Sequence, residues 1–311
     1  MLGWFSKSAQ VSGLLAVAIE PEALRFAHVR YFRERPRATE WWSVPVEGAE
    51  QAASLQRAAK DRGFGRATMT TLLDPADYQI LLVEPPKVAA PELKAAIRWK
   101  IKDLLEYHID DATVDVFEVR DEKANSAARA MYAVATPNEV VQKRIGVFEQ
   151  ARLPLRVIDI PEMAQRNVAS LFESLDKATA MLAFSSWGGL LTISFLGELL
   201  LTRRLEVTAA QLADREHGDH YRERVAIELT RSLDMYERQR LSVAVGELLL
   251  APLPQDPGLE DFLRDKLYVP VASADLPKVM DFAGTGEPTL EEQWEYFHLL
   301  GAALRVEERA L

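Results

Sequence analysis

Residues 14–31, LLAVAIEPEALRFAHVRY, place two apolar runs on either side of the turn residues Glu20-Pro21-Glu22. Apolar runs of this length around such a turn are typical of a β-hairpin. The pattern returns in residues 178–201, ATAMLAFSSWGGLLTISFLGELLL, where two runs flank Gly188-Gly189 and a third follows Gly197-Glu198. The recurrence predicts two lobes, each of which opens on a β-hairpin.

The second of these stretches also satisfies the length criterion for a membrane span, because residues 178–197 include no charged side chain. Serine, threonine and glycine residues dilute its apolar character, and the turn at Gly197 interrupts it. These features favour a buried hairpin over a span. Residues 1–13 lack a charged region followed by an apolar run and a cleavage site, so no secretory signal is recognised there.

Strand-like and helical patterns alternate along the rest of the chain, which predicts an α/β fold. The strand-like runs lie at residues 41–46, 67–73, 78–83, 113–120, 130–136, 155–160, 241–250 and 268–271. The helical patterns lie at residues 49–62, 92–107, 138–150, 161–175, 219–240, 257–267 and 290–305. The polar pair Asp176-Lys177 precedes the second hairpin and is the predicted boundary between the lobes.

The chain is acidic, since 37 Lys and Arg residues stand against 47 Asp and Glu and give a formal net charge of −10. This balance argues against a nucleic-acid partner and against stable adsorption to anionic lipid. The absence of cysteine excludes disulfides, thiol nucleophiles and Cys-ligated metal centres. Phosphate-loop, dinucleotide, zinc-protease and serine-hydrolase motifs are also missing, so no catalytic residue and no metal ligand is nominated.

Residues 93–117, LKAAIRWKIKDLLEYHIDDATVDVF, carry the most specific pattern in the chain. They resemble the signature of the type IV pilus assembly proteins of the PilM class, and most closely its MshI branch, which serves mannose-sensitive haemagglutinin (MSHA) pili. Ile97 and Trp99 match the Ile-x-Trp helix of that class, and Asp110, Asp111 and Asp115 match its acidic turn and strand. Residues 155–164 and 228–236 are similar to two further family motifs, so the resemblance extends over most of the chain.

The resemblance implies an actin-like (ASKHA) fold, in which two related lobes flank a cleft. Residues 1–176 are then the first lobe, with an inserted subdomain at about 66–153, and residues 177–311 are the second lobe. The second lobe is expected to be reduced. Only nineteen residues separate Val207 from Ile227, too few for the extra subdomain that covers the nucleotide in active relatives.

In nucleotide-binding members of this fold, the first hairpin of each lobe carries Asp-x-Gly, whose amides face phosphate and whose Asp orients a magnesium-bound water. Alignment on the hairpins places Ala18 and Glu20 at these positions in the first lobe, and Ala183 and Ser185 in the second. Residues 249–253, LLAPL, also lack the glycines of the adenosine-binding loop. The resemblance therefore implies degenerate phosphate loops without nucleotide, cofactor or metal, as in the similar cytoplasmic domains of GspL proteins of type II secretion.

The resemblance further implies a non-enzymatic cytoplasmic scaffold of an MSHA-type pilus assembly platform. It would be held at the inner membrane by the N-terminal tail of a bitopic PilN-like partner and linked to the pilus assembly ATPase. That tail is expected in a groove formed by the helix at 93–108 and the strand at 78–83. Trp99 lies off the apolar stripe of this helix and is the candidate anchor, with Arg98, Lys102 and Tyr107 as further contacts. Packing of Trp99 against another part of its own lobe is the alternative.

Two other functions stay open at this point. An ATP-binding actin-like ATPase or sugar kinase would need intact Asp and Gly turns, or a substitute for them. The cytoplasmic part of a GspL-like secretion-platform protein would be followed by a transmembrane helix, and no such segment follows before Leu311. The adaptor is therefore the expected function.

Overall fold

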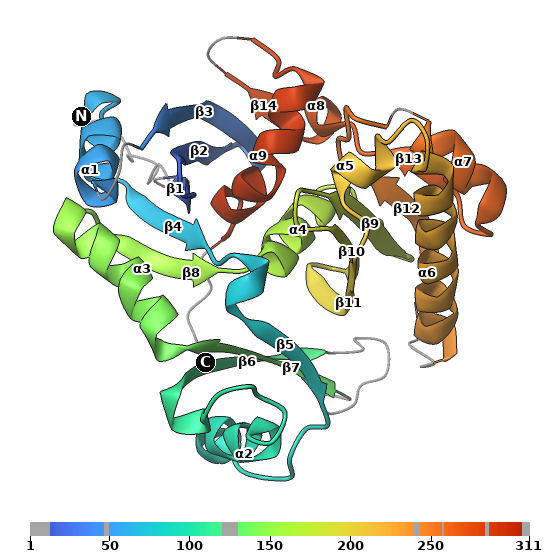
Figure 1. Cartoon of the computed structure of the whole chain (residues 1–311), viewed down its shortest axis with the longest axis horizontal. Coiled ribbons are helices and arrows are strands. Elements are labelled where there is room, and N and C mark those ends of the chain that lie inside the picture. The colour runs from blue at the N-terminus through green and yellow to red at the C-terminus, as the bar shows by residue number, and fades with distance from the viewer. Residues whose placement is uncertain are drawn as a thin grey trace, which may run out of the picture.

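Two mixed sheets with helices on their faces form the two lobes of the computed structural model (Figure 1). The structure describes residues 13–46, 50–119, 130–238, 243–256, 258–283 and 286–306. The stretch inspected for a secretory signal and the predicted helix-to-strand junction at 239–242 fall outside these residues, apart from Gly13.

Within the described residues, the first sheet has six strands. Their order is β14 (Asp281–Phe282), β3 (Arg35–Pro45), β2 (Ala23–Phe32), β1 (Leu14–Ile19), β4 (Thr68–Leu72) and β8 (Leu155–Asp159). The first predicted hairpin is confirmed, because β1 runs antiparallel to β2. Side chains alternate along β1, so Leu15 and Val17 pack under α1 (Gln51–Asp61) and α3 (Asn138–Ala151). Ala16 and Ala18 face α4 (Pro161–Ala169) and α9 (Leu290–Ala303) on the other side.

The second sheet has five strands in the part of the chain that the structure describes. Their order is β11 (Glu198–Leu205), β10 (Gly189–Phe195), β9 (Ala178–Phe184), β12 (Val245–Leu250) and β13 (Val271–Ser273). The second hairpin is confirmed as well, since β9 and β10 pair antiparallel and all of their residues are buried. Within the described residues, no helix combines the length and the apolar character needed to cross a bilayer.

Helices cover both faces of the second sheet. The face opposite α4 and α9 is packed by α5 (Ala209–Leu212), α6 (Gly218–Arg238) and α7 (Leu259–Lys266), whose apolar side chains share one core with the strands. The short helix α8 (Leu276–Val279) precedes β14. The segment between Val207 and Ile227 holds only α5, a turn and the start of α6, as the reduced second lobe requires.

A third sheet, inserted into the first lobe, has the order β5 (Gln79–Val83), β7 (Ala130–Pro137) and β6 (Ala112–Val119). The insertion is narrower than the predicted 66–153. Strand β4 pairs with β1 in the main sheet, and α3 packs against α1. One face of the third sheet carries α2 (Leu93–Ile101), and Tyr132 on the other face packs into the core of the second lobe. The three-residue 3-10 helices are η1 (Pro75–Asp77), η2 (Ala90–Glu92) and η3 (Ile109–Asp111).

Helix α2 is shorter than the predicted 92–107, since it ends at Ile101. Ile97 and Ile101 are fully buried against the third sheet, whereas Leu104, the next residue of the predicted stripe, is 57% exposed. The helix thus ends where its contact with the sheet ends, because a short helix depends on the burial of one face for its stability. The groove expected over 93–108 therefore has a helical wall only as far as Ile101.

Helices α4 and α9 lie between the two main sheets and cross at close range (Figure 1). Gly301 of α9 permits this approach, because a Cβ atom there would lie 2.2 Å from the carbonyl oxygen of Ala164. The Asn167 side chain donates a hydrogen bond to the Gly301 carbonyl at 2.9 Å. One apolar cluster therefore runs from the first sheet through both helices into the second.

Candidate functional site

The turn between β1 and β2, which contains Glu20, uses its own polar groups. The Glu20 amide donates to the Ala23 carbonyl at 3.0 Å, and the Glu20 carboxylate pairs with Arg25. The following residue, Pro21, has no amide hydrogen. The turn therefore presents a carboxylate and a proline where a phosphate loop presents backbone donors.

The turn between β9 and β10 is closed in a similar way by Ser185. The Ser185 hydroxyl accepts from the Trp187 amide at 3.3 Å and donates to the Gly188 carbonyl at 3.1 Å. Gly188 has a φ of +137°, and a Cβ atom there would lie 2.5 Å from the Leu205 carbonyl oxygen. The glycine thus serves the close approach of β11, and the Trp187 amide of this turn already has an acceptor.

The two alanines expected at the Asp positions are packing residues. Ala183 is 3% exposed and belongs to the apolar cluster around α4 and α9, and Ala18 packs against the same cluster. The loop after β12 is also fixed by backbone bonds, since the Ala251 amide donates to the Leu182 carbonyl at 2.9 Å. A carboxylate at position 183 would be buried among apolar side chains, which is unfavourable without a partner.

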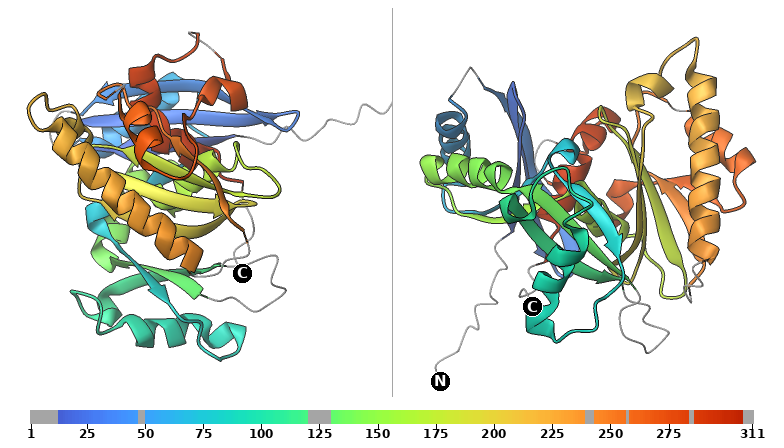
Figure 2. Two further views of the ribbon diagram at one scale, coloured as in Figure 1. Left: turned by 90° about the vertical axis from the view of Figure 1, so that its right-hand side faces the viewer. Right: turned by 60° about the horizontal axis from the view of Figure 1, so that its bottom comes forward.

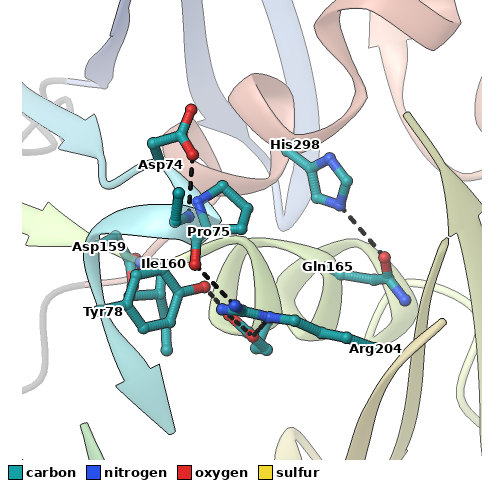
Figure 3. A network of polar contacts seen from close by, with 10 residues as sticks. Asp74, Pro75, Tyr78, Asp159, Ile160, Gln165, Arg204 and His298 are labelled. Carbon is teal, nitrogen blue, oxygen red and sulfur yellow. Dashed lines mark hydrogen bonds and ion pairs between the residues drawn. The ribbon is translucent and has the colours of Figure 1, made fainter. Parts of the chain in front are cut away.

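The sequence did not single out two buried carboxylates, one at the end of β8 (Asp159, labelled in Figure 3) and one in the first turn of α4 (Glu162). Asp159 accepts from Arg305 at 2.9 Å and from the Ile160 amide, and is 4% exposed. Glu162 is fully buried and receives two hydrogen bonds from the Arg204 guanidinium, at 3.0 and 3.1 Å. Each carboxylate is thus paired with an arginine, and neither is left free to orient a metal-bound water.

Arg204 also connects three parts of the fold (Figure 3). It extends from β11 of the second lobe, bonds Glu162 at the end of the first lobe, and donates to the Pro75 carbonyl at 2.7 Å where the insertion begins. Tyr78 donates its hydroxyl hydrogen to Glu162 and lies under the Arg204 guanidinium. Burial and, second, the Glu162 charge raise the pKa of Tyr78 well above its usual value, which keeps this donor protonated.

A neutral polar network joins α4, α9 and the second hairpin. The Gln165 amide nitrogen donates to the Met181 and Leu190 carbonyls at 2.9 and 3.0 Å, and its oxygen lies 3.2 Å from His298 Nε2 (Figure 3). Burial lowers the pKa of His298 to about 4, so the imidazole is uncharged at neutral pH and can donate from Nε2. The interior between the lobes is thus occupied by paired protein groups.

Some of the predicted tail-binding residues are accessible to a partner, and others are engaged in contacts within the inserted subdomain. Trp99 is 71% exposed on the side of α2 away from the third sheet, so it does not pack within its own lobe. The Lys102 ammonium lies 3.6 Å from the centre of its ring. Arg98 instead donates to the carbonyls of Ala112 and Ile109, at 2.8 and 2.5 Å. Trp99 and Lys102 are available to a partner, whereas Arg98 holds the start of β6.

Tyr107 lies in the turns after α2 and is partly buried. Its hydroxyl oxygen is enclosed and has no hydrogen-bond partner among the described residues, and burial raises its pKa. The neighbouring strand β5 is an edge strand, since it pairs only with β7 in the described sheet. Leu82 on this strand is 52% exposed. An edge strand with an exposed apolar side chain is suited to binding an extended peptide.

No metal centre is formed by the part of the chain that the structure describes, since no three of its His, Asp and Glu side chains gather as ligands. A cavity of about 260 Å³ lies between β11 and α6 and is lined by Arg203, Arg204, Arg224, Glu206 and Glu228, among others. Arg203 bonds Glu228 across it at 2.9 Å. The cavity is on the outer side of the second sheet, and Leu205 and Glu206 of its lining lie next to Gly188 of the second turn.

No protein-family model and no curated protein matches this sequence. Solved structures do match, and the chain has the mixed α/β actin-like fold that the resemblance implied. It is similar to PilM of a PilM-PilN type IV pilus biogenesis complex, with 19% identity, 95% of this chain and 98% of that chain covered, and a TM-score of 0.73. At this identity the likeness establishes the fold.

Two further structures have lower scores. The cytoplasmic domain of EpsL, an inner-membrane component of the type II secretion system of Vibrio cholerae, matches at 13% identity and a TM-score of 0.49, over 93% of this chain and 95% of that one. A Bacteroides thetaiotaomicron protein with an actin-like ATPase fold matches at 11% identity and a TM-score of 0.49, over 90% and 96%.

Proposed function

We propose that the protein is a non-enzymatic adaptor of a type IV pilus assembly platform, of the PilM class and its MshI branch. It binds the N-terminal cytoplasmic tail of a bitopic, PilN-like inner-membrane protein and links that partner to the assembly ATPase of an MSHA-type pilus. The proposal is supported by the pattern in residues 93–117 and by the likeness in fold to PilM of a PilM-PilN complex over nearly the whole chain. The adaptor works on the cytoplasmic face of the inner membrane.

The proposal that the protein is not an enzyme is supported by one observation, the closure of both turns by their own side chains. Ser185 caps the second turn, and Glu20, paired with Arg25, occupies the first. Phosphate loops work through unpaired amides and a metal-orienting carboxylate, and both turns depart from that arrangement. The lobes are held together by protein groups, so the fold does not depend on a nucleotide to connect them.

The tail is proposed to bind along the free edge of β5 and across α2. Main-chain bonds to β5 supply affinity for any extended segment, and side-chain contacts supply specificity. Leu82 and the exposed Trp99 offer apolar contact area on opposite sides of the inserted subdomain. Lys102, stacked over Trp99, adds a positive charge that suits an acidic or carbonyl-rich partner.

We expect no saturable binding of Mg-ATP in the micromolar range, because Pro21 has no amide donor, the Glu20 carboxylate pairs with Arg25, and Ala18 and Ala183 cannot orient a hydrated metal. A ligand at about 1,000 times its dissociation constant stabilises the folded state by about 4 kcal/mol. A thermal-shift titration to millimolar Mg-ATP, with isothermal calorimetry beside it, should therefore show no comparable shift. An actin-like ATPase measured in parallel is the positive control. A saturable, magnesium-dependent shift would overturn the non-enzymatic reading.

Replacing Trp99 by alanine is expected to weaken binding of the cognate tail by about thirtyfold, as for an aromatic hot spot. Fluorescence anisotropy with a labelled tail peptide measures the effect. Tyr268→Ala is the matched control, since Tyr268 is a 53% exposed aromatic residue in the second lobe. Its affinity should equal that of the wild type.

Leu82→Asp tests the other half of the surface, since Leu82 lies on β5. Loss of binding in Leu82→Asp alone would locate the tail on β5 and show that Trp99 does not contact it. Unchanged affinity in both folded variants would show that the tail does not bind this surface. Failure of every cognate tail to bind the wild-type protein would contradict the adaptor mechanism.

A further inference from the structure

The end of the β2–β3 hairpin extends past the neighbouring strand of its sheet (Figure 2). Strand β1 pairs with β2 only as far as Val29, whereas β2 and β3 continue to the pair Phe32 and Arg35. Arg30 is paired with Arg37, two residues before Phe32 along β2. Because directly paired residues of an antiparallel ladder lie on the same face, these four side chains form one face of the hairpin end.

The five residues Arg30, Phe32, Arg33, Arg35 and Arg37 are called the hairpin tip below. The Phe32 ring is 55% exposed, and the guanidinium groups of Arg33 and Arg37 lie 5.7 and 5.3 Å from its centre. Arg35 and Arg37 share the Asp281 carboxylate, at 2.7 and 3.3 Å. The tip therefore combines an exposed aromatic ring with more basic than acidic groups.

The turn at the tip has an unusual backbone for its sequence. Arg33 and Glu34 have φ values of +50° and +70°, a left-handed conformation that glycine and asparagine adopt at much lower cost. The turn thus keeps two long charged residues where small residues would form it more easily. Residues held in such conformations are enriched at functional sites.

The local charge departs from that of the whole protein. Residues 30–37, RYFRERPR, hold four arginines and one glutamate in a chain of net charge −10. Lys278, whose carbonyl accepts from Arg35, lies beside the tip, and its ammonium pairs with Asp275 at 3.0 Å. The negative net charge of the whole chain argued against adsorption to anionic lipid. Adsorption depends, however, on the charges of the protein that face the lipid surface.

The chain also enters the fold at this end of the sheet. Leu14 pairs with Val29, and a Cβ atom at Gly13 would lie 2.6 Å from the Arg30 side chain, so the first described residues lie next to the tip. The sequence that precedes Gly13, MLGWFSKSAQVS, contains Leu2, Trp4 and Phe5 together with Lys7, and the first acidic residue of the chain is Glu20. Aromatic and basic residues without acidic ones are typical of segments that contact a membrane interface.

We propose that the hairpin tip is a docking surface for an anionic phospholipid bilayer. The arginines bind lipid phosphates, for which guanidinium geometry is well matched, and Phe32 enters the boundary between headgroups and acyl chains. The end of a two-stranded hairpin is convex, which fits a flat bilayer better than a peptide that needs a groove. The tip lies on the first main sheet, apart from the inserted subdomain, so a membrane contact there does not rest on the proposed tail site.

The test is flotation of the full chain with vesicles of phosphatidylcholine alone or mixed with phosphatidylglycerol. We expect binding only to the anionic vesicles, weakened by salt. Each basic residue near an anionic surface contributes about fivefold to binding, so Arg30→Glu/Arg33→Glu should weaken it by at least tenfold. Phe32→Ser should also weaken it, through loss of apolar insertion. The control Arg215→Glu/Arg231→Glu changes net charge equally in the other lobe and should bind within about twofold of the wild type.

A spectroscopic probe locates the contact. The chain contains no cysteine, so Glu34→Cys carries a single thiol for an environment-sensitive fluorophore. Its emission should shift to the blue with anionic vesicles, whereas a fluorophore on Glu216→Cys should not change. Absence of anionic-vesicle binding by the wild type overturns the proposal, as does equal loss in the control. Tip-dependent binding of polyglutamate without binding of vesicles would identify an acidic protein partner instead and would also overturn it.

Discussion

Replacing Arg204 by methionine is expected to lower the free energy of unfolding by about 3–5 kcal/mol, the range for breaking a buried ion pair from one side. Glu162 is fully buried, and the change removes both guanidinium donors at 3.0 and 3.1 Å while leaving its charge in place. The Pro75 carbonyl loses its bond to Arg204 as well. Tyr78 remains as a single donor to the carboxylate.

Chemical denaturation of Arg204→Met measures this effect, and Arg203→Met is the control. The neighbouring Arg203 bonds Glu228 at 2.9 Å, but both side chains are about one-third or more exposed, so its loss should matter by at most about 1 kcal/mol. Adding Glu162→Gln to Arg204→Met should recover part of the loss, because the buried charge is removed. Equal destabilisation by the two arginine variants would contradict the central role of Arg204.

Replacing Gly301 by alanine is expected to destabilise the fold by about 3 kcal/mol, at the upper end of the usual range for overpacking. The new Cβ atom would lie 2.2 Å from a backbone carbonyl oxygen and 3.1 Å from a Val168 methyl group. Backbone cannot move aside as a flexible side chain can, so α4 and α9 must separate. The shift would also disturb the bond from Asn167 to the Gly301 carbonyl.

Gly146→Ala is the matched control for this variant. Gly146 lies inside α3, and a Cβ atom there has open space around it. The higher helix propensity of alanine should therefore stabilise the protein by about 0.5–1 kcal/mol. The two glycine-to-alanine changes thus have opposite predicted signs in one thermal-denaturation experiment. A neutral Gly301→Ala would show that the helix crossing can relax.

The hairpins that open each lobe were predictable because their buried residues follow one another directly in the sequence. Leu15 and Val17 face one helical layer while Ala16 and Ala18 face another, so both faces of β1 are apolar and the run is continuous. Strand β9 is buried along its whole length in the same way. Apolar runs interrupted by turn residues identify such strands without knowledge of their neighbours.

Elements that depend on distant partners were not predictable in this way. Strand β14 has two residues, and only its pairing with Arg37 and Ala38 of β3 makes it a strand. The end of α2 was predicted too late because Leu104 continues the apolar spacing without reaching the sheet. The limits of the insertion depend on β4, whose place in the main sheet is set by its pairing with β1.

The candidate site also contains some residues that the sequence identifies and others that only the structure brings together. Alignment on the hairpins placed Ala18, Glu20, Ala183 and Ser185 at the phosphate-loop positions, and the structure adds what they do there, from packing to capping a turn. Glu162 and Arg204 could not be paired from sequence, since 42 residues separate them. Glu162 directly follows Pro161, and a glutamate is common in the first turn of a helix, so the sequence does not mark it as buried. The position of Trp99 off the apolar stripe left open whether it packs on its own lobe, and the structure shows it 71% exposed.

The place of β14 in the first sheet has a consequence for biosynthesis. A ribosome delivers the N-terminal strands first, but the strand that lines the outer edge of β3 is made only after residue 280, behind the whole second lobe. Helix α9, which covers the inner face of the first sheet, is made later still. The first sheet of the nascent chain therefore has an unpaired edge and an uncovered face until the second lobe has been synthesised. About 100 residues of the second lobe are added in this interval, at about 5–20 residues per second. Chaperone protection during those seconds matters more for this topology than for two lobes that complete themselves in chain order.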